Sequence, residues 1–179
     1  GQRTYMYPQA VIDGHLLDLF WAEPVPPAPA TTIMEWLERR HGSLWTASYN
    51  LELDAWTNPV RLYGGVFNWS KGAVDRIMRW PNGDLGIVAP ANAIDQSSVL
   101  YVSRRQGIWK AQRVSTATES VAYTSTTLIG DTVVVAFVAG RSEHGMKDVN
   151  SVFLTYSENR GKTWSEPHRI IRGADEPTL

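Results

Sequence analysis

The chain has 179 residues and a mass of 20.0 kDa, the size of one ordinary domain. Its 17 Lys and Arg against 18 Asp and Glu give a formal net charge of -1, so there is no basic excess to bind nucleic acid or an acidic membrane surface. The chain has no cysteine, which excludes disulfide scaffolds and cysteine nucleophiles, and no apolar run near the roughly 20 residues that span a bilayer.

Eight Trp, 14 Gly and 10 Pro favour short strands joined by tight turns. Three segments repeat one pattern: a strand, a Gly turn, a more apolar strand, a loop, a third strand, and a Gly turn leading to a Trp that opens a fourth strand. The first turns fall at Gly14, Gly83 and Gly130, and the tryptophans are Trp45, Trp109 and Trp164. Four antiparallel strands in about 45–50 residues form a β-propeller blade. We therefore predict an all-β partial propeller over residues 1–179, with three four-stranded blades at about 4–53, 73–117 and 121–173.

One segment has an alternative interpretation. Thr31–Arg40 has helix-like apolar spacing, but it aligns with Val99–Val102 and Phe153–Tyr156, so we interpret it as a third strand. Pro24–Ala30, between the second and third strands of the first repeat, and Asp54–Gly72, before the second repeat, are interpreted as insertions. Both predict surface loops, which carry function more often than cores do.

The third repeat ends in the motif S-E-N-R-G-K-T-W, residues 157–164. Short side chains such as Ser157 and Asn159 can hydrogen-bond the backbone of their own turn. Gly161 can supply a positive φ, and Trp164 offers a large apolar face for packing between strands or blades. The motif resembles the Asp box, S-x-D-x-G-x-T-W, of sialidase-like propellers, with Asn in place of Asp.

Two weaker copies stand at the matching places of the other repeats. Ser103–Trp109 is one residue short, and Glu38–Trp45 keeps only the Gly and the Trp. In sialidase-like proteins these boxes are folding devices at the blade periphery, so the resemblance implies a fold and not a chemistry. It implies a structural role for Ser157, Asn159, Gly161, Thr163 and Trp164.

Three blades do not close a ring, because propellers have about four to eight. We expect half of a six-bladed propeller, completed by further blades in a longer chain or by another subunit. Asp175–Leu179 reads as an interrupted inner strand, which favours the longer chain.

Ligands of propellers bind in the axial funnel, near the start of each inner strand. Aligning the three turn glycines places Tyr7, Arg76 and Tyr123 at one inner-strand position, with Asp75 and Glu119 close by. Each has a structural alternative: the tyrosines can pack at strand starts, and Arg76 can pair with either acid.

The resemblance gives these residues roles, because sialidase-like glycosidases use an arginine cluster, a Tyr–Glu pair and an Asp. It implies Tyr123 as nucleophile, Glu119 as its base and Asp75 as the acid. Arg76 would bind a sugar carboxylate bidentately, with Tyr7 beside it. The family uses three arginines, and only one lies in the matching register here.

The loop from Trp56 to Trp69 offers aromatic faces that can stack on sugar rings, and we predict that these two tryptophans bind substrate. The alternative is that they cover a blade junction. The four histidines show no metal-ligand spacing, and no phosphate loop or nucleophile elbow occurs, so we expect no metal and no cofactor.

These patterns favour a sialidase-like, exo-acting glycoside hydrolase that acts on a glycan in the axial funnel. The alternatives are a non-catalytic propeller that binds glycans or proteins, and an assembly scaffold. The expected partners are a glycan and the remaining blades, with no nucleic acid and no membrane span. The resemblance slightly favours a secreted or extracytoplasmic protein, although Gly1–Tyr7 does not resemble a signal peptide.

Overall fold

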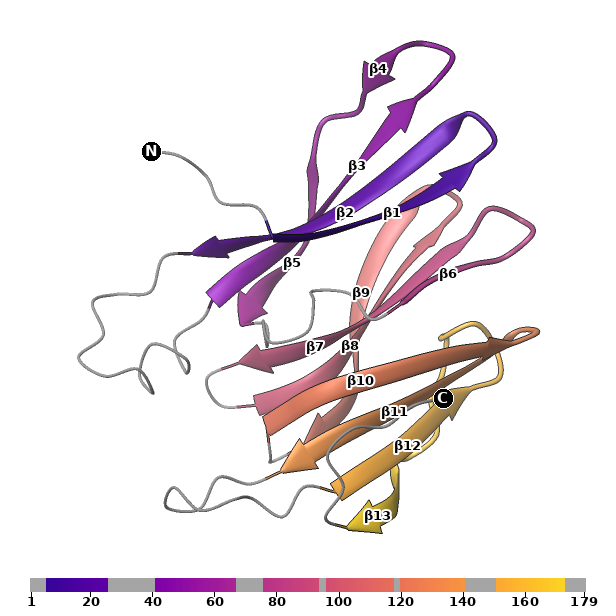
Figure 1. The fold of residues 1–179 in the computed structure, drawn as a ribbon. Helices are drawn as coiled ribbons and strands as arrows, with labels where there is room; N and C mark the ends of the chain where they lie inside the picture. Colours follow the sequence, from indigo (N-terminus) through magenta and orange to yellow (C-terminus); the bar gives the residue numbers. More distant parts are fainter. Residues whose placement is uncertain are drawn as a thin grey trace. The chain divides into compact units, whose positions relative to one another are not determined.

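The computed structural model describes residues 6–25, 41–66, 76–93, 96–117, 120–140 and 151–172. These residues form three antiparallel sheets, and no helix occurs among them (Figure 1). The predicted all-β class, a partial propeller with antiparallel blades, is confirmed. The predicted third strand within Thr31–Arg40 lies outside the described residues. The chain divides into two compact units, Gly1–Val74 and Asp75–Leu179, which we describe separately.

The first unit contains one sheet, here called sheet A. Its strands are β1 (Met6–Asp13), β2 (Leu16–Val25), β3 (His41–Asn50), β4 (Ala55–Trp56) and β5 (Val60–Val66). The order is β1-β2-β3, and both β4 and β5 then pair with β3, at its two ends. Sheet A is therefore a four-stranded blade with a small additional hairpin at one end.

Sheet A departs from the predicted layout in its outer half. Trp45 lies in the middle of β3, between Trp21 and Arg61, and does not open a fourth strand. Gly42 precedes it not in a turn but in the strand, paired with Pro24 on one side and with Gly65 on the other. The fourth strand is β5, which comes from the segment interpreted as an insertion. Aligning Trp45 with the other two tryptophans was wrong, because a Gly within a strand resembles a turn signal.

The second unit contains two four-stranded meanders. Sheet B consists of β6 (Arg76–Arg79), β7 (Leu85–Ala93), β8 (Gln96–Arg105) and β9 (Ile108–Ala117). Sheet C consists of β10 (Ser120–Ile129), β11 (Thr132–Gly140), β12 (Ser151–Ser157) and β13 (His168–Arg172). The predicted turn glycines do lie in the turns after β1, β6 and β10, each with a positive φ: Gly14, Gly83 and Gly130.

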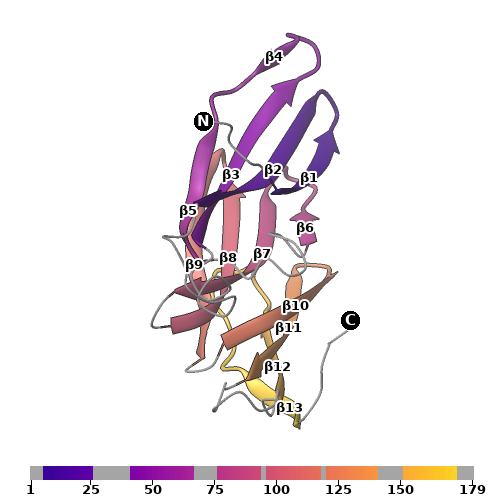
Figure 2. The same cartoon turned by 60° about the vertical axis from the view of Figure 1, so that its left-hand side comes forward.

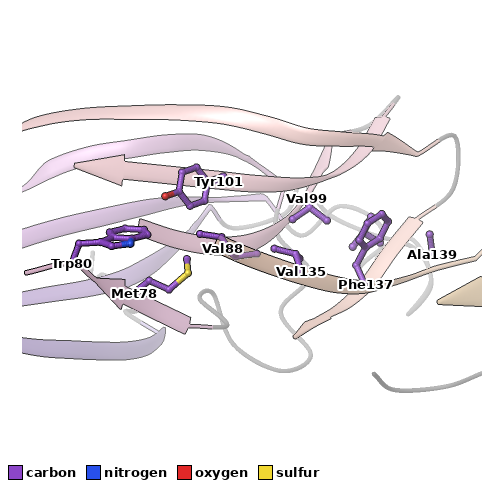
Figure 3. Close-up of a cluster of buried hydrophobic side chains, with 10 residues drawn as sticks. Met78, Trp80, Val88, Val99, Tyr101, Val135, Phe137 and Ala139 are labelled. Atoms are coloured by element: carbon purple, nitrogen blue, oxygen red, sulfur yellow. The ribbon is translucent and has the colours of Figure 1, made fainter. Parts of the chain in front are cut away.

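Sheets B and C pack on each other and share one core. In both views β10 lies beside β7 and β8 (Figures 1 and 2). Alternate residues of β11, such as Val135 and Phe137, point into a cluster that also holds Met78, Val88 and Tyr101 of sheet B (Figure 3). All five side chains are at most 1% exposed. Burying each of the large ones stabilises the folded state by about 1.5–3 kcal/mol, so this cluster holds the two sheets together.

Candidate functional site

Arg76 opens β6, and its side chain is exposed. Its Nη1 donates a hydrogen bond of 3.2 Å to the backbone carbonyl of Thr126 on β10. The guanidinium therefore bridges the inner strands of sheets B and C. Because an arginine carries five N–H groups, this one bond leaves donors that can face a ligand.

Tyr123 lies on the strand that Arg76 contacts. Only its backbone is described, and it pairs with Val138 of β11, next to an irregularity between Val121 and Tyr123. Three residues of β10 separate Tyr123 from Thr126, a distance of about 10 Å along the strand. Of the predicted site residues, these two are the pair that the structure brings to neighbouring strands.

Arg76 and Tyr123 do not, however, share one position in their sheets. Arg76 faces Val88 in the fourth pair from the β6–β7 turn, whereas Tyr123 faces Val138 in the seventh pair from the β10–β11 turn. The reason is the longer first turn, which the Trp80 N–H closes by donating to the carbonyl of Asp84 at 3.1 Å. The predicted common position, counted from the glycines, was wrong because the turns differ in length.

The remaining predicted residues of this site are only partly described. Tyr7 lies on β1 at the irregularity between Met6 and Gln9, and only its backbone is described. Asp75, Glu119 and Trp69 lie outside the described residues. The roles given to all of these residues stay predictions.

Trp56 lies at the opposite end of sheet A from Tyr7. It pairs with Tyr49 near the β1–β2 turn, whereas Met6 beside Tyr7 pairs with Ala22, which in turn faces Leu44. Five residues of β3 separate Leu44 from Tyr49, about 17 Å. Trp56 and Tyr7 therefore do not contact one sugar residue together.

The Trp56 side chain is 53% exposed. The ring of Tyr49 supports it at 5.0 Å between centroids and a tilt of 43°. The Tyr49 hydroxyl donates to the carboxylate of Asp54, and this hydrogen bond raises the tyrosine pKa above its usual value. The pair is thus an exposed aromatic surface held in place by a neighbouring ring.

The turn of residues 157–164, here called the box turn, is held by its own side chains. Ser157 Oγ accepts the N–H of Gly161 at 2.7 Å, and Asn159 Oδ1 accepts the N–H groups of Lys162 at 3.0 Å and Thr163 at 2.9 Å. Asn159 Nδ2 also donates to the Thr163 hydroxyl at 2.8 Å. A carboxylate could accept from that hydroxyl instead, so Asn can replace Asp here. The predicted side-chain bonding of this turn is confirmed, as is the positive φ of Gly161, 82°.

The box turn also docks on sheet B. The carbonyl of Arg160 accepts the Tyr101 hydroxyl at 2.8 Å and Arg105 Nη2 at 2.5 Å, and the carbonyl of Gly161 accepts the Gln112 side chain. Burial raises the pKa of Tyr101 to about 12. The ring of Trp164 meets Tyr101 edge-on at 5.2 Å. Trp164 thus packs against the core that sheets B and C share, and the turn joins the two sheets.

Sequence reasoning missed the sheet B side of this junction. From the sequence, Tyr101 is one of several alternating residues of a predicted strand. Arg105 and Gln112 are polar, so the sequence predicts that their side chains face solvent. Nothing local to those residues shows that a turn about 50 residues further along the chain supplies their acceptors.

No group of three or more His, Cys, Asp or Glu side chains within the described ranges could hold a metal ion. Among the same residues, no helix is long and apolar enough to cross a membrane.

Comparison with known proteins gives one kind of match. No protein-family model matches the chain, and no curated protein does. Among solved structures, the chain is similar to an ulvan lyase described as a new family of polysaccharide lyase, PL25, with a TM-score of 0.50 and 10% sequence identity. The match covers 96% of this chain and 43% of the lyase, so the chain spans less than half of that protein. At this identity the likeness concerns the fold alone.

Proposed function

We propose that the chain is part of a carbohydrate-active propeller that binds an acidic glycan in the second unit, where Arg76 of β6 contacts β10. The observation that carries the proposal is Arg76, an exposed guanidinium anchored by one bond to the strand of Tyr123. A planar guanidinium suits a sugar carboxylate because it can bind both oxygens at once. The fold's similarity to a polysaccharide lyase also supports a glycan ligand.

The reaction proposed is hydrolysis by a sialidase-like mechanism, for which the box turn's likeness to an Asp box is the support. Tyr123 attacks the anomeric carbon and forms a covalent intermediate, while Glu119 takes its proton, since a free tyrosine has a pKa near 10. Asp75 protonates the leaving oxygen and then activates the water that releases the sugar. Arg76 holds the carboxylate throughout.

A second candidate reaction is elimination from a polysaccharide that carries uronic acids, favoured by the similarity in fold to a polysaccharide lyase. Here Arg76 neutralises the uronate carboxylate, which makes the neighbouring C5 proton more acidic. Tyr123 takes the C5 proton and gives it to the departing C4 oxygen, so that the C4–O bond breaks and a C4–C5 double bond forms. Hydrolysis leaves no such double bond.

A third candidate is binding without catalysis. The exposed pair of Trp56 and Tyr49 supports it, because aromatic side chains give sugar rings an apolar face to pack on. This pair lies at the turn end of sheet A, and binding a sugar there needs no catalytic acid.

Product formation and calorimetric binding, measured on the same sugars, separate the three candidates. The chain is incubated with a panel of aryl glycosides of acidic and neutral sugars and with a polyuronate, and both the released aryl group and the ultraviolet absorbance of an unsaturated uronate are followed. Hydrolysis releases the aryl group from an acidic sugar, and Tyr123→Phe abolishes this release while binding survives. Unsaturated product supports elimination. If wild-type chain binds none of these sugars, the glycan proposal fails.

We also propose that further blades complete the propeller. The support is the outer strand β13, in which every residue is exposed, including Ile170 at 57% and Ile171 at 52%. The matching strand β9 alternates between exposed and half-buried residues. An outer strand with two exposed apolar residues is typical of a surface that a partner covers. Sedimentation velocity tests this: the 179 residues alone should self-associate, and a stable monomer would contradict the proposal.

A further inference from the structure

The turn end of the second unit contains an open depression of about 560 Å³. Four turns form its wall: those between β6 and β7, β8 and β9, and β10 and β11, and the box turn. The polar side chains that line it include Asp84, Gln106, Asp131, Glu158, Arg160 and Lys162. Six residues of β10 separate Tyr123 from the end of that strand, about 20 Å, so the depression is distinct from the site proposed above.

Part of the wall is fixed by internal bonds. Arg160 Nε donates to Asp131 at 2.8 Å, and the Arg160 guanidinium lies 5.9 Å from the ring centre of Trp80. The carboxylate of Asp84 accepts Asn82 Nδ2 at 2.9 Å and the N–H of Gln106 at 3.4 Å. The turns that form the depression are therefore ordered before any ligand arrives.

Three other side chains of the wall are exposed and uncommitted. Within the described part of the chain, the Glu158 carboxylate, the Lys162 ammonium and the Gln106 amide have no hydrogen-bond or ion-pair partner. Together they offer an acceptor, a donor and a group that does both. Ordered turns that present unpaired polar side chains on one concave surface are suited to binding a polar small molecule.

The charges of the wall decide which ligand fits. Its cations are Arg105, Arg160 and Lys162, and its carboxylates are Asp84, Asp131 and Glu158. An anionic ligand would meet the carboxylates and a cationic ligand the arginines and lysine, so neither gains from the balance. A ligand rich in hydroxyl groups gains from both, because each hydroxyl is donor and acceptor at once. We propose that this depression binds a neutral sugar residue, as a second saccharide site apart from Arg76.

The test is calorimetric titration of the whole chain with a neutral probe, maltotetraose, and an acidic probe, a tetragalacturonate. Three variants are compared: the double change Glu158→Gln with Lys162→Met, the change Arg76→Ala, and the control Lys110→Ala on the exposed face of β9. Glu158 and Lys162 make no side-chain bond among the described residues, so the double variant should keep its thermal stability.

We expect the double variant to lose at least tenfold in affinity for the neutral probe, and the control and Arg76→Ala to bind it like wild type. This pattern also separates the two sites, since Arg76→Ala should affect the acidic probe alone. The proposal is overturned if wild type does not bind the neutral probe, if the double variant binds it unchanged, or if Arg76→Ala removes it.

Discussion

Sheets B and C end their third strands in different turns, although the sequence makes them copies of one another. In sheet B, Gln106 and Gly107 form a two-residue hairpin turn with φ values of 50° and 79°. In sheet C the box turn is wider, and Ser157 and Asn159 hold it from inside. Among the described residues of the second unit, the wide turn is the one whose backbone carbonyls accept hydrogen bonds from the other sheet. The additional residues therefore do more than reverse the chain, because they carry the carbonyl groups that join sheets B and C.

The largest expected effect comes from the two turn glycines. Gly161 and Gly107 both need a positive φ, but a Cβ at Gly161 would overlap the Tyr101 ring, whereas one at Gly107 meets nothing within 4 Å. Gly161→Val combines backbone strain with overpacking, each of about 1–3 kcal/mol, so we expect a loss of about 4 kcal/mol in the free energy of unfolding. Gly107→Val should reduce the free energy of unfolding only by the cost of backbone strain, about 1–3 kcal/mol. Urea denaturation measures both, and equal losses would contradict the docking of the box turn.

The second comparison uses the tryptophan that follows each turn. Both tryptophans are half-buried, but Trp164 packs on the shared core, whereas Trp109 lies against Arg104, whose guanidinium is 5.4 Å from its ring centre. Trp164→Ala should cost about 3 kcal/mol and Trp109→Ala about 1 kcal/mol. The same denaturation curves report the difference, and a reversed order would show that the two turns have exchanged roles.

The next largest effect is expected from the serine at the start of the box turn. Ser157→Ala removes the acceptor of the buried Gly161 N–H, and an unsatisfied buried donor costs about 1–3 kcal/mol. Ser103 at the matching place of sheet B is also buried, but its hydroxyl accepts no backbone N–H among the described residues, so Ser103→Ala should cost less than Ser157→Ala. Comparable losses in both variants would mean that Ser157 acts through packing alone.

The smallest effect of a substitution near neutral pH is expected at Tyr101, and it depends on pH. Tyr101 is protonated in the folded chain up to about pH 12, while in the unfolded chain it ionises near its usual value of 10.0. Between these values the folded state binds one proton more, so stability falls as pH rises, by about 1.4 kcal/mol per pH unit. Below pH 10 the contribution is fully present. Tyr101→Phe should cost about 1 kcal/mol at about pH 8 and flatten this fall, as denaturation from about pH 8 to about pH 11.5 would show. A slope equal to that of wild type would exclude Tyr101 as its source.

Much of the fold follows from local patterns in the sequence. The turns at Gly14, Gly83 and Gly130 and the apolar strands after them are where the sequence places them. The outer half of sheet A is not where the sequence places it. Gly42-Ser43 before Trp45 looks like a turn, but both residues lie in β3 and pair with strands β2 and β5. Strand pairing depends on residues far apart in the chain, and a local signal cannot outweigh it.

The candidate site was harder to predict than the fold. Counting from a turn glycine brings Arg76 near Tyr123, but it misplaces the two by three pairs because the Trp80–Asp84 turn is longer. The contact between Arg76 and the Thr126 carbonyl depends on how two sheets pack, which no spacing within one repeat encodes. The same limit applies to Trp56, whose distance from Tyr7 follows from the path of β3.

Arg76 is proposed to recognise an acidic sugar, and one measurement tests this role directly. The direct measurement is calorimetric titration of an acidic oligosaccharide into wild-type chain, Arg76→Ala and a matched control, Arg169→Ala, which removes an exposed arginine from the outer strand β13. Loss of a charge-assisted contact worth about 1.5–3 kcal/mol predicts a roughly 10- to 100-fold weaker affinity for Arg76→Ala and no change for the control. Equal affinity in all three proteins, with intact folding, would contradict the account.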